Sequence, residues 1–423
     1  MLKSLNLQMQ RVRNIVDYLF VYLLISLSGN QVFGETALIV TFLLSILLFL
    51  YRKEQLNRSY IYFIFILITI LLLQTVKFDF YPWVTMSGVI IRISLAYFII
   101  KSIGETFIDK YINTMIVISL VSTVVYFAIN LIPGLSNYLI NTFTLYVIRP
   151  DDEYSNIRYF FGFYTIVISP TDLSHTLIRN HGPFWEAGVM GGYVMLAMIF
   201  NALKTGQIFN KAGLFLMIVL LTTISTTAVL AAFIFVFFYL LAIKKHKLLK
   251  WIMVPIIIIT GYVSFFSLDF LGDKIMYRLE LAQQSSEVNS DRSSRFLDVV
   301  RDWKDFQGHE IIGRGVHSET RFGKTTKMSG LTARTNGITD HLLRYGSVFL
   351  IITFFLIYKS QLAVLRHYRH LNKIFAIGTT IVIFILLQSE PYFNYPFFWG
   401  LTFLYIIYIN NEEKEDDALY RNT

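Results

Sequence analysis

Long apolar stretches alternate with short polar stretches along most of the chain. Because roughly 20 apolar residues in a helix cross the hydrocarbon layer of a bilayer, the pattern predicts about 12 membrane-spanning helices. Residues 212–243 could form either one long helix or two short spans. The polar run 222–227 favours two short spans joined by a tight turn. The expected spans are residues 15–29, 33–50, 59–76, 84–100, 111–132, 184–203, 212–224, 227–243, 251–268, 339–358, 374–388 and 395–410.

Two polar segments, residues 133–183 and 269–338, are much longer than the other loops. The first contains an aromatic run, 157–164, which is too short to span, and we expect it to lie at the membrane interface or to re-enter the membrane. Neither an internal repeat nor a linker is visible. We therefore expect residues 1–423 to form a single integral membrane domain.

The second long segment contains a predicted amphipathic helix. Its apolar residues recur at helical spacing, and its charged residues lie elsewhere around the helix, so we expect it to lie on the membrane or on the helix bundle. A Gly313-Arg314-Gly315 turn follows, flexible enough to bring backbone close to a ligand. The apolar positions are Phe296, Val299, Val300, Trp303 and Phe306, and the charged ones are Asp298, Arg301, Asp302 and Asp305.

Composition and charge define the class and the orientation. The chain is 55% hydrophobic and has no cysteine, which excludes a soluble globular class, thiolate catalysis and disulfides. In a membrane protein the formal charge of +9 is interpreted loop by loop, since Lys and Arg concentrate on the cytoplasmic side. On one side the short loops carry only Lys77. We expect both termini in the cytoplasm, with 411–423 as an acidic tail, both long segments outside, and no nucleic-acid partner.

The stretch from Arg179 to Gly188 is a candidate anion site. Pro183 is expected at the first helical position, where its missing N–H costs nothing, and the next backbone N–H groups would then face an anion beside Arg179. Glu186 lies in the same stretch. The alternative is a plain helix start, with Trp185 anchored at the interface and Arg179 solvated.

A second candidate cluster lies at the start of the tenth expected span. Asp340, His341 and Arg344 share one helical face, because they are three and four residues apart. They form either a base and a cation that face an outer cavity, or a capped helix start from which Arg344 reaches the headgroups.

Other charged residues are less specific. Arg292, Arg295 and Arg314 are outer-loop arginines, and Arg92, inside a span, is expected to face the bundle interior or a wet cavity. The outer-loop histidines lack metal-ligand spacing and are expected at the surface. They are His175, His181, His309 and His317.

These segments resemble the O-antigen polymerase and O-antigen ligase superfamily of bacterial surface-glycan enzymes. Residues 179–188 are similar to the family's Arg-x-x-Gly-x-Phe-x-Glu-Pro-Gly stretch, except that Ala187 replaces Pro. Ser294-Arg295 through Trp303 and 311–315 resemble its periplasmic-loop pattern, and 341–346 resembles the start of the following span. Residues 221–225 are similar to a Thr-x-Ser turn of the family. Leu342 replaces the family's Asn, and Thr226 stands where ligases often have Arg.

The resemblance implies an all-α membrane fold of the GT-C glycosyltransferase type with a large periplasmic loop. It implies a polymerase of the inner membrane that transfers a glycan from undecaprenyl diphosphate to a lipid-linked repeat unit at the periplasmic face. A chain-length regulator protein is a further implied partner. The alternatives are a ligase that transfers glycan to lipid A core and, in another class, a lipid-linked oligosaccharide flippase or transporter. Polar residues concentrated at one face favour an enzyme over a transporter.

The residues suit that reaction. Arginine forks bind phosphate oxygens bidentately, so we expect Arg179, Arg295, Arg314 and Arg344 to bind the diphosphate. His341 is the expected general base, and Glu186 is the competing base or the group that orients the acceptor. We expect no cofactor and no metal, because the outer loops lack a clustered ligand set.

Overall fold

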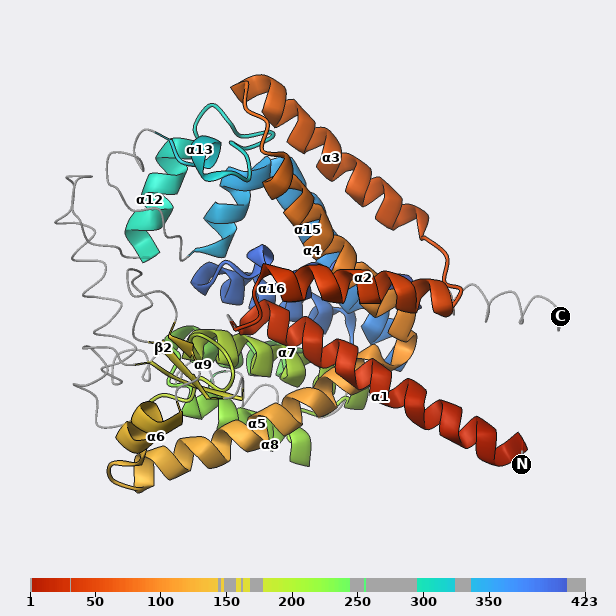
Figure 1. The fold of residues 1–423 in the computed structure, drawn as a ribbon, viewed down its shortest axis with the longest axis vertical. Helices are drawn as coiled ribbons and strands as arrows, with labels where there is room; N and C mark the ends of the chain where they lie inside the picture. The colour runs from red at the N-terminus through yellow and green to blue at the C-terminus, as the bar shows by residue number, and fades with distance from the viewer. Residues whose placement is uncertain are drawn as a thin grey trace. The chain divides into compact units, whose positions relative to one another are not determined.

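The structure is a computed structural model that describes residues 2–30, 32–143, 146–147, 157–160, 163–167, 178–243, 255, 295–323 and 336–408. These residues are almost entirely helical (Figure 1). The predicted all-α class is therefore confirmed, with a small sheet added. The layout of about 12 spans stays a prediction, and the expected span 251–268 lies outside the described residues apart from residue 255. Within the part of the chain that the structure describes, five helical segments could cross a membrane by length and composition: Leu7–Gly29, Arg58–Phe78, Trp83–Leu131, Ala187–Thr205 and Gly337–Tyr368.

The chain folds into two compact units that interleave along the sequence, so no linker marks the boundary between them. The first unit consists of Met1–Glu54, Phe98–Val229 and Tyr395–Phe397. The second consists of Gln55–Tyr97, Leu230–Asn394 and Phe398–Thr423.

The first unit is a helical bundle in which α1, α5 and α7 lie side by side and α8 packs on α7 (Figure 1). Helix α7 is buried along nearly its whole length, and small residues allow this close packing. A Cβ added at Gly191 would lie 2.7 Å from the Cβ of Ala228, so glycine lets the two backbones approach. The helices of this unit are α1 (Leu2–Gly29), α2 (Glu35–Tyr51), α5 (Phe107–Leu131), α6 (Leu135–Phe143), α7 (Ala187–Thr205) and α8 (Lys211–Thr222).

The predicted turn at residues 222–227 is confirmed. Helix α8 ends at Thr222 and α9 (Thr226–Ala242) begins four residues later, so this region is two helices. The hydroxyl of Thr223 donates to the carbonyl of Leu220 at 2.7 Å, which satisfies a carbonyl at the helix end. Ile224 has a φ of 46°, a conformation that interrupts the helix.

The described residues of the aromatic run, 157–160 and 163–164, lie in two strands and the turn before the second, which the sequence pattern did not predict. Strands β1 (Tyr146–Val147), β2 (Ile157–Phe160) and β3 (Tyr164–Val167) form an antiparallel sheet in that order. Phe160 is paired with Tyr164. Tyr164 and Ile166, on one face of β3, pack against Tyr126 and Ile129 of α5. Backbone pairing and this small apolar core hold the segment, and its place at the membrane stays a prediction.

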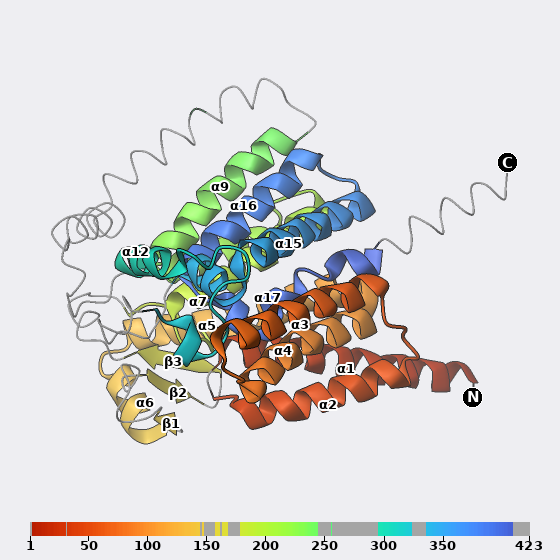
Figure 2. The same ribbon diagram turned by 90° about the horizontal axis from the view of Figure 1, so that it is seen from above.

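The second unit is organised around α15, which lies alongside α16, with α12 against α15 (Figure 2). Helices α4 and α9 contribute residues to both units. The unit contains α3 (Arg58–Phe78), most of α4 (Trp83–Ile103), α12 (Arg295–Phe306), α13 (Ser318–Arg321), α15 (Gly337–Tyr368), α16 (Lys373–Ser389) and η2 (Tyr392–Asn394).

Helix α12 confirms the predicted amphipathic helix, but its charged face points inward. Arg301, Asp302 and Asp305 are buried, whereas Trp303 is 58% exposed. The carboxylates tolerate burial because each accepts a hydrogen bond: Asp302 from the hydroxyl of Thr339 at 2.5 Å, and Asp305 from the N–H of Gly323 at 3.0 Å. The helix therefore packs on the bundle through these polar contacts and through Phe306, which is also buried.

Candidate functional site

Helix α15 is broken near its start, at Gly346, whose φ of 81° and ψ of 175° are not helical. A break leaves backbone groups without their helical partners, which is costly in an apolar setting. Here the carbonyl of Leu343 accepts hydrogen bonds from the N–H groups of Arg314 at 2.6 Å and Gly315 at 3.3 Å. The N–H of Ser347 donates to the carbonyl of Glu310 at 2.8 Å. The loop 310–315 thus closes the break.

Close approach of this loop requires glycine. A Cβ added at Gly346 would lie 2.1 Å from the carbonyl oxygen of Ile311, and one at Gly313 would lie 2.7 Å from that of Leu343. Buried Gln74 of α3 completes the contact, since its amide donates to the carbonyls of Ile312 and, at 2.7 Å, Arg344. The Gly-Arg-Gly turn therefore brings backbone close to α15.

The half-helix before the break carries a buried carboxylate held by two arginines. The Nε of Arg344 donates to Asp340 Oδ2 at 2.9 Å, and Arg321 Nη2 lies 2.5 Å from Asp340 Oδ1. The Asp340 side chain is 3% exposed. Asn336 caps the helix, because its side chain accepts from the N–H groups of Ile338 and Thr339 at 3.0 Å. Arg344 thus pairs with Asp340 within the bundle.

A third arginine belongs to this cluster. Arg344 is hydrogen-bonded to the side chain of Tyr345, and the Tyr345 phenol interacts electrostatically with Arg92, Arg321 and Arg344. Arg92 lies in α4 and is partly buried, and whether it faces the bundle interior or a wet cavity stays a prediction. We call Arg92, Arg321, Asp340, Arg344 and Tyr345 the arginine cluster.

His341 lies next to the cluster in sequence, but its side chain occupies an aromatic box. Its ring centroid lies 4.8 Å from that of Phe393, 4.9 Å from Tyr345, 5.6 Å from Trp399 and 5.9 Å from Phe349. The residue is 1% exposed. Neither ring nitrogen has a hydrogen-bond partner among the described residues. The expected base is therefore enclosed by aromatic rings and does not face an open cavity.

Arg314 is engaged by the loop that it belongs to. Its Nε donates to the carbonyl of Thr320 at 3.0 Å and its Nη1 to that of Asp305 at 3.4 Å, and its guanidinium lies over the ring of Phe78. Partial burial lowers the pKa of Arg314 from its ordinary value, and nearby Asp305 acts in the opposite direction. These contacts hold the Arg314 guanidinium within its own loop and against α3.

Two of the predicted arginines are not described. Arg295 begins α12, but its side chain lies outside the described residues, as does the whole of Arg292.

In the first unit, the helix after Arg179 starts later than predicted. Helix α7 begins at Ala187, so Pro183 is not its first residue and lies in a preceding turn. The N–H of Phe184 donates to the carbonyl of His181 at 3.1 Å, and that of Trp185 to Gly29 at 3.2 Å. Those two groups are therefore not available to an anion.

Packing explains the delayed start. The ring of Phe184 is stacked on that of Tyr193 with centroids 4.7 Å apart, and it also lies against Gly29. A Cβ added at Gly29 would be 2.0 Å from the Phe184 ring. This contact fixes Phe184 in the turn, and the helix begins only beyond it.

Arg179 and Glu186 both remain partly exposed. The Nε of Arg179 donates to the carbonyl of Thr223 at 3.1 Å, and the Asn180 side chain donates to Thr222 at 2.9 Å. Glu186 is the N-cap residue of α7, with extended backbone. The stretch is thus tied to the turn between α8 and α9, and it presents one cation and one carboxylate.

His181 was predicted at the surface, and this is wrong. It is 3% exposed. Burial lowers the pKa of His181 to about 3; Arg179 acts in the same direction, and Glu186 opposes it. His309 and His317 are partly exposed, and His175 lies outside the described residues.

No protein-family model matches the chain, and a comparison with curated proteins finds no match. The resemblance to the O-antigen superfamily therefore rests on the motifs alone. The structure divides the expected site residues: Arg179 and Glu186 lie in the first unit, and Arg314, His341 and Arg344 in the second.

Sequence analysis missed Arg321 and Gln74. A lone amide within an apolar span could have drawn attention to Gln74. Nothing local marks Arg321, since its partner Asp340 is 19 positions away in the sequence.

Proposed function

We propose that the protein is a membrane glycosyltransferase of the O-antigen polymerase type, which extends a surface glycan on a lipid diphosphate carrier at the periplasmic face of the inner membrane. The observation that supports this is the arginine cluster, in which two guanidinium groups hold one buried carboxylate at the start of α15 and Arg92 interacts electrostatically with the adjoining Tyr345. Arginine stays charged and binds phosphate oxygens with a planar fork, which suits a diphosphate leaving group.

The reaction requires charge neutralisation and one proton acceptor. A hydroxyl of the acceptor sugar attacks the anomeric carbon of the donor, the bond from that carbon to the diphosphate oxygen breaks, and the electron pair leaves with the diphosphate. Arg344 and Arg321 neutralise the diphosphate, and Asp340 keeps both arginines in place. The hydroxyl proton passes to a base, a step that contributes typically 10²- to 10⁴-fold.

His341 and Glu186 remain the two candidates for the base. His341 belongs to the same unit as the arginine cluster, but the aromatic box must open before its imidazole reaches a substrate. Glu186 is partly exposed and accessible in the first unit. The twelve-span layout and the GT-C-type fold belong to the same proposal.

Chain extension in membranes tests the proposal. In a strain that lacks its own polymerase, the wild-type chain should restore a glycan ladder, and Arg344→Gln should abolish it while the protein still inserts. Arg366→Gln is the matched control, because Arg366 lies in the last turn of the same helix. A full-length ladder from Arg344→Gln would refute the assigned role of the cluster.

Three further experiments identify the base, distinguish a polymerase from a ligase and test for a metal requirement. His341→Gln and Glu186→Gln identify the base. The variant that lacks the true base should extend glycan at least about 100-fold more slowly than wild type. A strain from which this protein is deleted should carry lipid A core capped with a single repeat unit. Glycan that accumulates on the lipid carrier, with none on lipid A, would indicate a ligase. EDTA should leave extension unchanged, and loss of activity that a divalent ion restores would contradict a metal-independent mechanism.

A transporter is the second candidate, because α15 is broken within a segment long enough to span, and broken helices are common in transporters. The break lies only nine residues from the start of a 32-residue helix, however, and therefore nearer one end than the middle. Translocation of lipid-linked glycan by vesicles that form no glycosidic bond would favour the transporter.

A further inference from the structure

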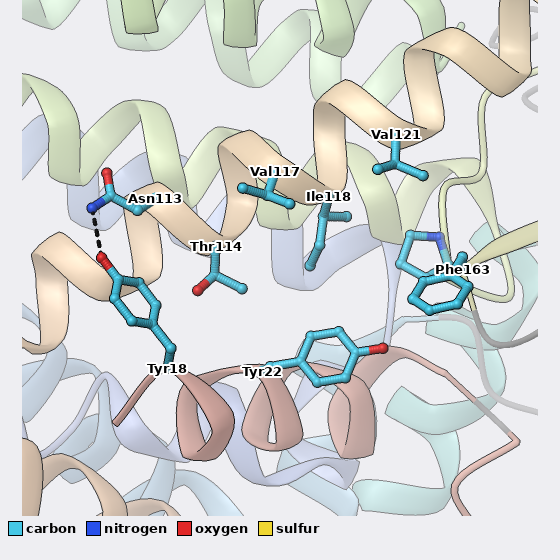
Figure 3. Close-up of a pocket in the computed structure, with 9 residues that line it drawn as sticks. Tyr18, Tyr22, Asn113, Thr114, Val117, Ile118, Val121 and Phe163 are labelled. Atoms are coloured by element: carbon cyan, nitrogen blue, oxygen red, sulfur yellow. Dashed lines mark hydrogen bonds between the residues drawn. The ribbon is translucent and has the colours of Figure 1, made fainter. Parts of the chain in front are cut away.

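Helices α1 and α5 of the first unit enclose a groove of about 380 Å³ (Figure 3). One strip of each helix lines it: Tyr18 and Tyr22 on α1, and Val117, Ile118 and Val121 on α5. The ring of Tyr22 lies along the groove in Figure 3, with its hydroxyl towards Phe163. The walls are almost wholly apolar, so the space suits hydrocarbon.

The groove has two different ends. At one end the amide of Asn113 donates to the hydroxyl of Tyr18 at 2.9 Å, which joins the two helices (Figure 3). Phe163 lies at the opposite end in the same view, and Pro183 also lines the pocket. Pro183 belongs to the turn that connects Arg179 to Glu186, so the groove adjoins a stretch that carries exposed charge.

Both helices belong to segments long and apolar enough to span a membrane. Val117 is 61% exposed, so the groove opens to the surroundings of α5. In a membrane those surroundings are lipid tails, which reach such a groove directly.

We propose that this groove binds part of the isoprenoid chain of the acceptor's polyprenyl carrier, with the phosphate end towards the stretch from Arg179 to Glu186, whereas the donor's diphosphate is the one assigned to the arginine cluster. One strip from each helix leaves room for a single chain. A polyprenyl carrier has one chain, whereas a glycerophospholipid has two side by side. The choice of carrier lipid rests on the proposed function.

Filling the groove tests the assignment. Val117→Trp places a large ring in the groove, and Leu120→Trp is the matched control, because Leu120 is 55% exposed on the same helix and does not line the groove. The full-length proteins are purified in detergent and titrated with undecaprenyl phosphate under native mass spectrometry. Val117→Trp should bind undecaprenyl phosphate about tenfold more weakly, because the chain loses the burial of a few methylene groups. Leu120→Trp should bind it within about twofold of wild type.

Two results would overturn the assignment. One is equal affinity of Val117→Trp, Leu120→Trp and wild type for undecaprenyl phosphate. The other is loss of a co-purified phospholipid from Val117→Trp with undecaprenyl phosphate binding unchanged, which would make the occupant a bilayer lipid. Should Val117→Trp aggregate, Val121→Trp, on the same wall, replaces it.

The groove and the proposed function fail separately. If wild type extends glycan and Val117→Trp both binds the carrier and extends glycan normally, the groove assignment falls and the function stands. If Val117→Trp loses carrier binding but wild type forms no glycosidic bond, the function falls and the groove stands.

Discussion

Replacing Gly346 with alanine should destabilise the protein by disrupting the break in α15. The residue has a φ of 81° and a ψ of 175°, a region that only glycine adopts readily. Its added Cβ would lie 2.1 Å from the carbonyl oxygen of Ile311. That carbonyl is backbone, so the loop 310–315 must shift to relieve the contact, and the shift would disturb the hydrogen bonds that Leu343 accepts.

The magnitude follows from two terms. The backbone strain costs on the order of 1–3 kcal/mol. The steric overlap costs about 1–3 kcal/mol more, as for other insertions into packed sites. The expected loss of unfolding free energy is therefore about 2–6 kcal/mol, a large fraction of the roughly 5–15 kcal/mol that typically stabilises a folded domain.

Two other glycines separate these terms. Gly104 has a φ of 70° and open space around it, so Gly104→Ala should show strain alone, about 1–2 kcal/mol. Gly34 has open space and no positive φ, so Gly34→Ala should stay within about 1 kcal/mol of wild type. Unfolding in mixed micelles, followed by tryptophan fluorescence, measures all three. Equal stability of Gly346→Ala and Gly104→Ala would show that the loop does not press on the break.

Two further predictions concern buried titratable side chains: His181, and the pair formed by Arg321 and Asp340. His181 stays neutral in the fold because its pKa is lowered to about 3, whereas in the unfolded chain it titrates near its ordinary 6.5. The unfolded chain thus binds more protons, and the free energy of unfolding should fall as the pH drops from about 6.5 towards 3. His181→Leu should reduce this dependence of the unfolding free energy on pH. An unchanged dependence in the variant would contradict the prediction. A double-mutant cycle of Arg321→Gln and Asp340→Asn should give a coupling of about 0.5–3 kcal/mol in unfolding experiments, and additive effects would exclude the pair as a stabilising contact.

Local sequence patterns predicted local structure well. The run 222–227 predicted the turn between α8 and α9, because several hydroxyl side chains compete with helical backbone bonds. The spacing of Asp340 and Arg344 predicted that both lie on one face of a helix, since they are four residues apart; that they form an ion pair there was not predicted. Arg92 was expected to face the bundle because charge is costly against lipid.

Tertiary packing decided what these patterns left open. Whether the apolar or the charged face of α12 is buried depends on partners such as Thr339 and Gly323, which lie elsewhere in the sequence. The aromatic box around His341 likewise depends on Phe393 and Trp399, which lie far along the chain.

Hydropathy and spacing predicted a mostly helical protein with helices long and apolar enough to cross a membrane, and with its charged residues in a few clusters. The tertiary structure alone brought Arg321 to Asp340 and the loop 310–315 to the break at Gly346. Periodicity reports contacts three or four residues apart, whereas these contacts join backbone and side chains that only the packing of whole helices brings together.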